Sequence, residues 1–208
     1  ADAKEHSITN MCWRENLVVQ LGPGLFGGIT FGHWIKLLRL NRFEVAPQCW
    51  MRAMTISATA AITSACSLYE NLKYGNQFRN VEIEPPLFIL GHWRSGTTHL
   101  HNLFSIAKRF AFPNFYQVLS PHSFLTTENA VTKMFGKLVP SKRPIDNVKL
   151  AFDVPYEDEF ALCVSTHYSN YTSIAFPRQE EQNHRFLTMR DVTPEELDQW
   201  RAALTLFL

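Results

Sequence analysis

The pattern of apolar and polar positions predicts a long helix in the first half of the chain. From Pro47 to Tyr74, apolar residues recur at steps of three and four, and Gly75 follows as a helix stop. The middle of this segment is rich in small residues, which favours close packing against a neighbouring element. We expect its periodic apolar positions to form the buried face: Trp50, Met54, Ala58, Ala61, Ile62, Ala65, Leu68, Tyr69 and Leu72.

The second half of the chain predicts three further helices. Shorter helices are expected at 123–138 and at 155–165, the latter with Asp153 as its cap. Thr193 and Glu196 have capping-box spacing with a proline between them, and an apolar face continues to Phe207. The sequence ends within this last helix without a termination signal, so we interpret the chain as a fragment of a longer protein.

A short apolar run lies between these helical regions. Residues 87–90 are apolar and Gly91 ends the run, which is typical of a buried strand in a parallel sheet. A helix follows from Thr97 or Thr98, so the order is strand, glycine-bounded loop and helix, as in the first half of a βαβ unit. We therefore predict an α/β fold with a central parallel sheet and flanking helices. Residues 1–80 form a helical N-terminal region, and residues 81–208 form the N-terminal part of a P-loop domain.

Residues 25–42 mix apolar and basic side chains at helical spacing, including Trp34, Lys36 and Leu38. Two interpretations fit this pattern. The segment is either a helix packed on the domain or a helix that lies on a membrane surface.

Composition narrows the function classes. The 208 residues are 46% hydrophobic and 19% charged, with a formal net charge of +1. This profile is typical of a globular domain and lacks the basic block expected of a protein that binds nucleic acid. Cys12, Cys49, Cys66 and Cys163 form no CxxC pair, so we expect reduced buried thiols and no metal site. No secretory signal is readable, which favours a cytoplasmic location, either free or membrane-associated.

The loop from Gly91 to Thr98 carries the clearest chemistry. Its two glycines stand five positions apart after an apolar run and before a helix, the spacing of a phosphate-binding P-loop. However, Thr97 occupies the position of the lysine that nucleotide triphosphatases use, and Asp153 is a weak candidate for a magnesium ligand. Arg94 offers a guanidinium to phosphate or sulfate oxygens instead. This combination suits a nucleotide handled without a metal.

The segment PPLFILGHWRSGTTHLHNLF resembles the 5′-phosphosulfate loop of sulfotransferases, in the branch with RSGTT, and similarity to bacterial-type sulfotransferases extends from HWIKLLRLNRF to PYEDEFALCVS. The resemblance implies the P-loop α/β fold of that family, with 3′-phosphoadenylyl sulfate (PAPS) as donor. It assigns donor binding to Arg94, Ser95, Gly96, Thr97 and Thr98. The residues that bind the donor's 3′-phosphate would lie beyond position 208.

Sulfuryl transfer to a hydroxyl or amine acceptor also needs a base, alongside Arg94 as the group that stabilises negative charge. His122 is one candidate, because an imidazole accepts a proton near neutral pH. Glu157, within the crowded YEDE segment, is the other. The sequence does not distinguish between a small molecule, a carbohydrate and a lipid as the acceptor.

Two other functions compete with this reading. An atypical P-loop kinase or nucleotide hydrolase would require magnesium-dependent ATP binding. A non-catalytic membrane-surface or interaction module would bind vesicles through residues 25–42 without binding nucleotide.

Overall fold

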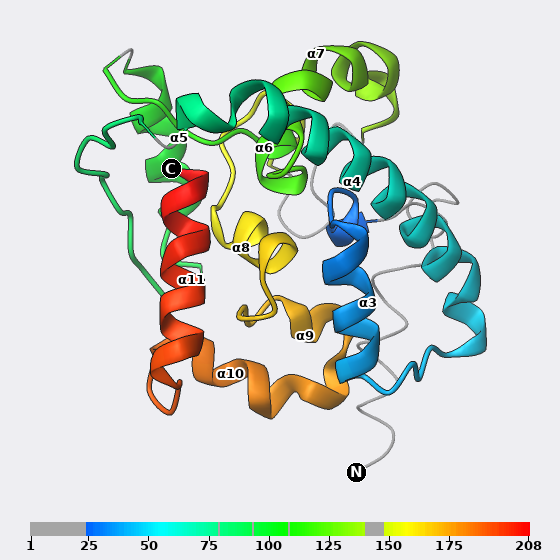
Figure 1. Ribbon diagram of the computed structural model, residues 1–208. Helices are drawn as coiled ribbons and strands as arrows, with labels where there is room; N and C mark the ends of the chain where they lie inside the picture. Colours follow the sequence, from blue (N-terminus) through cyan, green and yellow to red (C-terminus); the bar gives the residue numbers. More distant parts are fainter. Residues whose placement is uncertain (1–23, 79, 93, 108, 140–147) are drawn as a thin grey trace.

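The computed structural model describes residues 24–78, 80–92, 94–107, 109–139 and 148–208, and its regular elements there are helices (Figure 1). The elements, in chain order, are η1 (Gly24–Phe26), α3 (Phe31–Leu40), η2 (Pro47–Cys49), α4 (Trp50–Phe78), α5 (Thr97–Ile106), α6 (Phe115–Leu119), α7 (Phe124–Phe135), η3 (Gly136–Leu138), α8 (Glu159–Ser165), α9 (Thr172–Ala175), η4 (Pro177–Gln179), α10 (Glu180–Thr188) and α11 (Pro194–Phe207).

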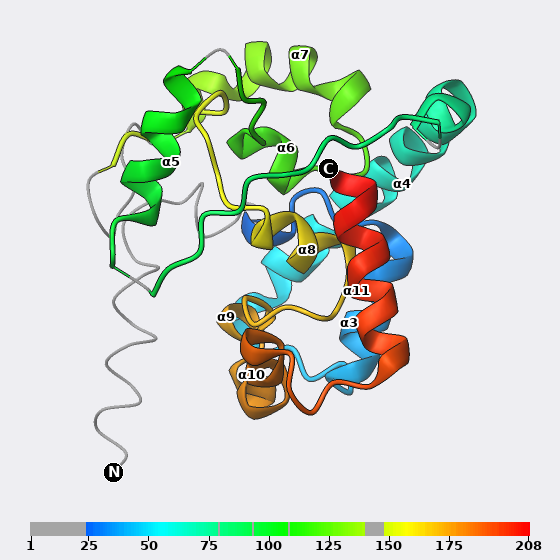
Figure 2. The ribbon, with the colours of Figure 1, turned by 90° about the vertical axis from the view of Figure 1, so that its left-hand side faces the viewer.

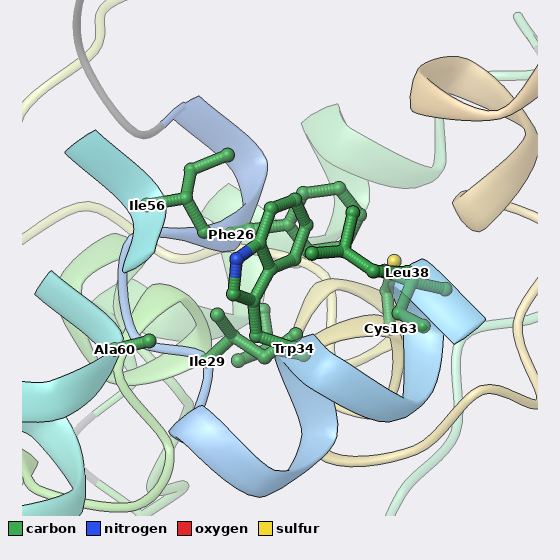
Figure 3. Packing of buried hydrophobic residues seen from close by; sticks show 9 residues of the cluster. Phe26, Ile29, Trp34, Leu38, Ile56, Ala60 and Cys163 are labelled. Carbon is green, nitrogen blue, oxygen red and sulfur yellow. The ribbon is translucent and has the colours of Figure 1, made fainter. Parts of the chain in front are cut away.

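The core forms where α3 packs against α4 and α8, and Figure 3 shows its side chains converging from all three helices. The Trp34 indole is 3% exposed, and its Nε1 donates to Ser57 Oγ on α4 at 2.9 Å. The backbone N–H of Phe31 donates to Ser64 Oγ on the same helix at 2.8 Å. Small side chains on α4 therefore let the two helices approach closely. Trp34 and Leu38 are both buried here. These apolar side chains pack in the core, whereas a helix lying on a membrane surface would present them to the bilayer.

The long helix is confirmed, but its predicted buried face is wrong. Helix α4 continues through Gly75 to Phe78, and it buries Ile56, Ala60, Thr63 and Glu70. The predicted apolar face points largely to solvent, with these residues more than half exposed: Trp50, Met54, Ile62, Leu68, Tyr69 and Leu72. The face of small side chains packs instead, because it permits the close contact with α3.

The prediction of a central parallel sheet is also wrong. Residues 81–92 are neither helix nor strand, so the buried strand predicted at 87–90 does not form, and the described residues give this segment no partner strand. Leu87 is 57% exposed and Leu90 is 88% exposed. The described residues contain an isolated antiparallel bridge between Asn114 and Pro155, and Lys149 is a further bridge residue. An apolar run specifies an extended backbone, whereas a sheet also needs neighbours for its N–H and C=O groups.

The other predicted helices form, with one shifted start. Helix α5 begins at Thr97, α7 occupies most of 123–138, and α11 begins with the predicted capping box of Thr193 and Glu196. Helix α8 begins at Glu159 rather than at 155, so Asp153 does not cap it. The buried carboxylate of Glu70 on α4 stabilises the start of α7, where its Oε1 accepts from both the N–H and the hydroxyl of Thr126 at 2.7 Å.

The thiols are free where the structure describes them, but their burial differs from the prediction. Cys163 is buried, Cys66 is half-buried and Cys49 is exposed, whereas Cys12 lies outside the described residues. None of the described helices combines the length and apolar character that crossing a membrane would require.

Candidate functional site

The loop before α5 adopts a tightly turned conformation. Its backbone is left-handed at Arg94 (φ 65°) and at Gly96 (φ 93°), and the N–H and hydroxyl of Ser95 both donate to the His92 carbonyl, at 3.1 and 2.5 Å. A Cβ added at Gly91 would lie 2.7 Å from the Ser95 and Thr97 side chains. The loop therefore needs glycine at both positions where the sequence places one.

This conformation presents polar groups at the start of a ten-residue helix. Arg94, Ser95 and Gly96 are exposed, and Thr97 and Thr98 open α5 without a side-chain cap. The first N–H groups of a helix have no partner within it, and the helix dipole favours negative charge there. The loop can accordingly receive an oxyanion, with the Arg94 guanidinium beside it.

One face of α5 borders a cavity of about 240 Å³. The cavity lies between α5 and the segment that precedes α8, and its lining residues are Thr98, Asn102, Val148, Lys149, Val154 and Pro155. Thr98 is also a loop residue. The cavity therefore adjoins the loop, and the basic residue Lys149 is part of its lining.

The same face of α5 lies close to the acidic residues 157–159, which we call the acidic segment. His101 stands three residues after Thr98, so the two side chains share a helix face. Burial lowers the pKa of His101, and the negative charges of Asp158 and Glu157 oppose that effect. Figure 2 shows the segment before α8 running beside α5. The structure thus brings Glu157 to the helix that the loop opens.

The acidic side chains have distinct partners. Glu157 Oε2 accepts from the Tyr171 hydroxyl at 2.7 Å, while Glu159 accepts from the Ser169 hydroxyl. Burial raises the pKa of Asp158, and it raises the pKa of Glu159 to about 7. Burial and the bond to Glu157 raise the pKa of Tyr171, which keeps its phenol protonated as a donor. Glu157 is consequently held in a fixed position by a neutral hydroxyl.

His122 lies in a different environment. Its ring centroid is 5.6 Å from that of His33 on α3, which in turn is 5.6 Å from that of His167. Burial, followed by the neighbouring His33, lowers the pKa of His122 to about 4. Its Nε2 finds no partner among the described residues. The structure therefore groups His122 with two other histidines.

Sequence reasoning assigned no role beside the loop or the acidic segment to three residues. Lys149 precedes the apolar LAF run, His101 stands on α5, and Tyr171 lies 14 residues after Glu157. A signal existed for His101, because it shares a helix face with Thr98. No spacing rule connects Tyr171 or Lys149 to the loop. Among the described residues, no group of three or more His, Cys, Asp or Glu side chains is arranged to hold a metal ion.

Among known proteins, the chain is similar in sequence to curated sulfotransferases. The chain is 36% identical over 197 residues to omega-hydroxy-beta-dihydromenaquinone-9 sulfotransferase Stf3 of Mycobacterium bovis, and equally so to Stf3 of Mycobacterium tuberculosis. The match covers 94% of this chain and 49% of each relative, so the chain spans about half the length of these curated relatives. No family model matches the sequence. No solved structure matches it either. Over nearly its whole length, the chain is therefore similar to about half of these bacterial sulfotransferases.

Proposed function

We propose that this chain contributes the donor-binding loop and the base of a sulfotransferase that moves a sulfuryl group from PAPS to a hydroxyl acceptor. The observation that carries the proposal is the arrangement of α5, which starts at the RSGTT loop and presents one face to the segment of Glu157. Similarity to curated sulfotransferases supports the reaction type. A donor loop and a carboxylate on neighbouring elements are the two parts that such a transfer needs.

The loop would bind the 5′-phosphosulfate of the donor. N–H groups of residues 95–98 and the hydroxyls of Thr97 and Thr98 would contact its oxygens, and Arg94 would stabilise the charge that develops on them. Lys149, which lines the cavity together with Thr98, would offer a second cation to the same group. Fixed donors of this kind need no metal ion to neutralise the donor's charge.

Glu157 is the base that the geometry favours over His122. The acceptor oxygen attacks sulfur and forms a new S–O bond, while the bond from sulfur to the donor's phosphate oxygen breaks. The acceptor's hydroxyl proton passes to the Glu157 carboxylate, and the leaving phosphate keeps the electron pair. The Tyr171 hydroxyl orients the carboxylate through its 2.7 Å hydrogen bond.

The acceptor we propose is an apolar molecule with a terminal hydroxyl. The named relative acts on an omega-hydroxy dihydromenaquinone, which is lipid-like. In this chain, Val148, Val154 and Pro155 give the cavity beside Thr98 an apolar wall. Such a wall suits an aliphatic chain whose hydroxyl end points toward the loop.

Donor binding is the first test. We expect 3′-phosphoadenosine 5′-phosphate, the desulfated product, to bind in the presence of EDTA and to bind about 100-fold more weakly after Arg94→Ala, because losing one such donor costs about 3 kcal/mol. Isothermal titration measures this. Arg190→Ala, at another exposed arginine, is the matched control and should change nothing. Magnesium-dependent ATP binding in place of this result would contradict the proposal and favour a kinase.

The base is tested separately. We expect Glu157→Gln to lower kcat by at least about 100-fold with a long-chain alcohol as acceptor, while affinity for the desulfated product stays unchanged. Glu181→Gln, an exposed carboxylate on α10, is the control. Tyr171→Phe should give a smaller loss of kcat, because it removes only the orienting bond. Full activity in Glu157→Gln would rule out this carboxylate as the base.

A further inference from the structure

Two side-chain hydrogen bonds join the acidic segment to the turn that precedes α9. The Tyr171 hydroxyl donates to Glu157 Oε2 at 2.7 Å, and the Ser169 hydroxyl donates to Glu159 Oε1 at 2.5 Å. The bonded residues stand two positions apart on both segments, so the bonds fix the direction of one segment relative to the other as well as its position. The reaction proposed above uses the first bond alone, and the second has no role in it.

Ser169 connects the two bonds. Its side chain is completely buried, and its Oγ accepts the backbone N–H of Tyr171 at 3.1 Å while its own proton is donated to Glu159. A hydroxyl can donate and accept at the same time, so both functions of Ser169 are engaged. One buried hydroxyl therefore links the Glu159 carboxyl to the residue that orients Glu157.

The Tyr171 ring is held from a second side. The Phe160 ring on α8 packs edge-on against it with the centroids 4.8 Å apart, and the Tyr156 ring packs on Phe160 at the same centroid distance. Aromatic rings at such separations attract each other. Because both the backbone and the ring of Tyr171 are fixed, its bond to Glu157 also fixes the carboxylate.

Glu159 is suited to anchor this arrangement. Burial raises its pKa to about 7, the bond from Ser169 opposes that rise, and the charges of Asp158 and Glu157 add to it. The Cys163 thiol on α8 interacts with the same carboxyl and is neutral, because burial raises its pKa to about 12. A protonated carboxyl keeps an oxygen that accepts, so the bond from Ser169 persists in both protonation states of Glu159.

We propose that Ser169 is a positioning residue for sulfuryl transfer, which fixes Tyr171 against the buried Glu159 so that Tyr171 aims the Glu157 carboxylate at the acceptor hydroxyl. This inference rests on Glu157 as the base proposed above. A base is effective only when it is held within hydrogen-bond reach of the proton that it takes, so a carboxylate that is free to rotate loses rate. Ser169 acts through Tyr171 and does not touch the acceptor.

The first test is kinetic and uses the full chain with PAPS as donor and dodecanol as acceptor. We expect Ser169→Ala to lower kcat about fivefold, the rate equivalent of one hydrogen bond, while KM for dodecanol and affinity for the desulfated product stay unchanged. Ser173→Ala on α9 is the matched control, because that hydroxyl is also buried and has no hydrogen-bond partner among the described residues. It should keep the wild-type kcat. A fully active Ser169→Ala would overturn the proposal.

A double-variant cycle distinguishes positioning from a general loss of structure. Tyr171→Phe already lacks the bond to Glu157, so adding Ser169→Ala should lower kcat no further. A similar additional loss in the Tyr171→Phe background would contradict the proposal, because the effect of Ser169 would then not pass through Tyr171.

Variants of Glu159 test the same bond from its other end. Glu159→Leu removes the acceptor at similar size and should reproduce the loss of kcat seen in Ser169→Ala. Glu159→Gln keeps an amide oxygen that accepts from Ser169, so it should restore most of the lost rate. Equal losses in the two Glu159 variants would show that the bond does not matter.

A measurement without turnover tests the bond directly. Carbon NMR of the glutamate-labelled chain follows the Glu159 carboxyl signal from about pH 5 to 9. Ser169→Ala should move the pKa of Glu159 upward, because the carboxylate loses a donor, and Ser173→Ala should not. An unmoved pKa of Glu159 in Ser169→Ala would also overturn the proposal.

The role of Ser169 and the role of the base fail in different ways. Full activity in Glu157→Gln would remove the base and the role of Ser169 with it. An inactive Glu157→Gln beside a fully active Ser169→Ala would overturn only the role of Ser169 and leave the base standing.

Discussion

The core formed by α3, α4 and α8 differs from helix α5 in how far its side chains are buried. In the core, Ile29, Ala60 and Val164 are completely buried, and Trp34 is 3% exposed. In α5, no residue is buried, and both Leu100 and Leu103 are more than 40% exposed. The core therefore contains most of the buried apolar surface that stabilises the fold. Helix α5 follows the loop that we propose binds the donor.

This difference teaches that stability and donor binding should be separable by substitution. Burial of apolar area is the main source of folding free energy, and α5 contributes little of it. Substitutions in the core should therefore unfold the protein, and those in the loop should change binding in a protein that remains folded. Unfolding measurements on core variants and binding measurements on loop variants test this separation.

The largest effect is expected in the core. Trp34→Ala should lower the free energy of unfolding by about 3 to 5 kcal/mol, because it leaves a cavity and removes the hydrogen bond to Ser57. Trp50→Ala is the matched control, since that indole is 60% exposed and should cost under about 1 kcal/mol. Urea unfolding followed by circular dichroism measures both values. Equal losses at the two tryptophans would contradict the described core.

The fold could be predicted from sequence only where local chemistry determines it. The capping box at Thr193 and Glu196 is completed within four residues, so the start of α11 was predictable. The sheet was not, because pairing of residues 81–92 depends on segments distant in sequence. The buried face of α4 also misled us, since Ser57 and Ala60 pack through their small size rather than through apolar area.

An effect of intermediate size is expected from replacing either of two glycines, Gly28 near the core and Gly91 in the loop. A Cβ at Gly28 would lie 2.2 Å from the Leu119 carbonyl oxygen and 2.4 Å from Ser120 Cα, so the backbone would have to move. Gly28→Ala should therefore cost about 1 to 3 kcal/mol of stability. At Gly91 the Cβ would meet only side chains of the loop, those of Ser95 and Thr97.

Gly91→Ala should accordingly leave the unfolding midpoint almost unchanged and weaken binding of 3′-phosphoadenosine 5′-phosphate about tenfold, an estimate that corresponds to about 1.4 kcal/mol. Thermal unfolding and titration of the same samples separate the two effects. If Gly91→Ala destabilises the fold as much as Gly28→Ala does, the loop is part of the core's cooperative unit, and the comparison fails.

The candidate site was also predictable only in part. Spacing and residue type were enough to select Arg94 and the loop through Thr98, because a P-loop is a continuous segment. Glu157 was proposed from its crowded acids, and the structure adds His101 as the link between that segment and α5. The grouping of His33, His122 and His167 depends on three separate segments, so no local pattern predicts it.

The smallest effect is expected from pH, and it comes from buried groups on the core side. His122 and His167 have a folded-state pKa of about 4, below the ordinary value of 6.5. Their contribution to stability is complete above pH 6.5 and is lost as the pH falls toward 4. Glu159 has a folded-state pKa of about 7, above the ordinary 4.5, so its contribution is lost as the pH rises from 4.5 through 7.

These opposite slopes nearly cancel above pH 6.5, so stability should be almost level there and should fall on the acid side. Between pH 6.5 and 5, two histidines oppose one carboxyl, and the net loss should be about 1 to 2 kcal/mol. Urea unfolding across this range measures it. Glu159→Gln should turn the level region above pH 6.5 into a rise and steepen the acid side, whereas His122→Asn should flatten the acid side and produce a decline above pH 6.5. A profile that stays level above pH 6.5 in Glu159→Gln would contradict a raised pKa for this carboxyl, because removing a group with a raised pKa must change the slope there.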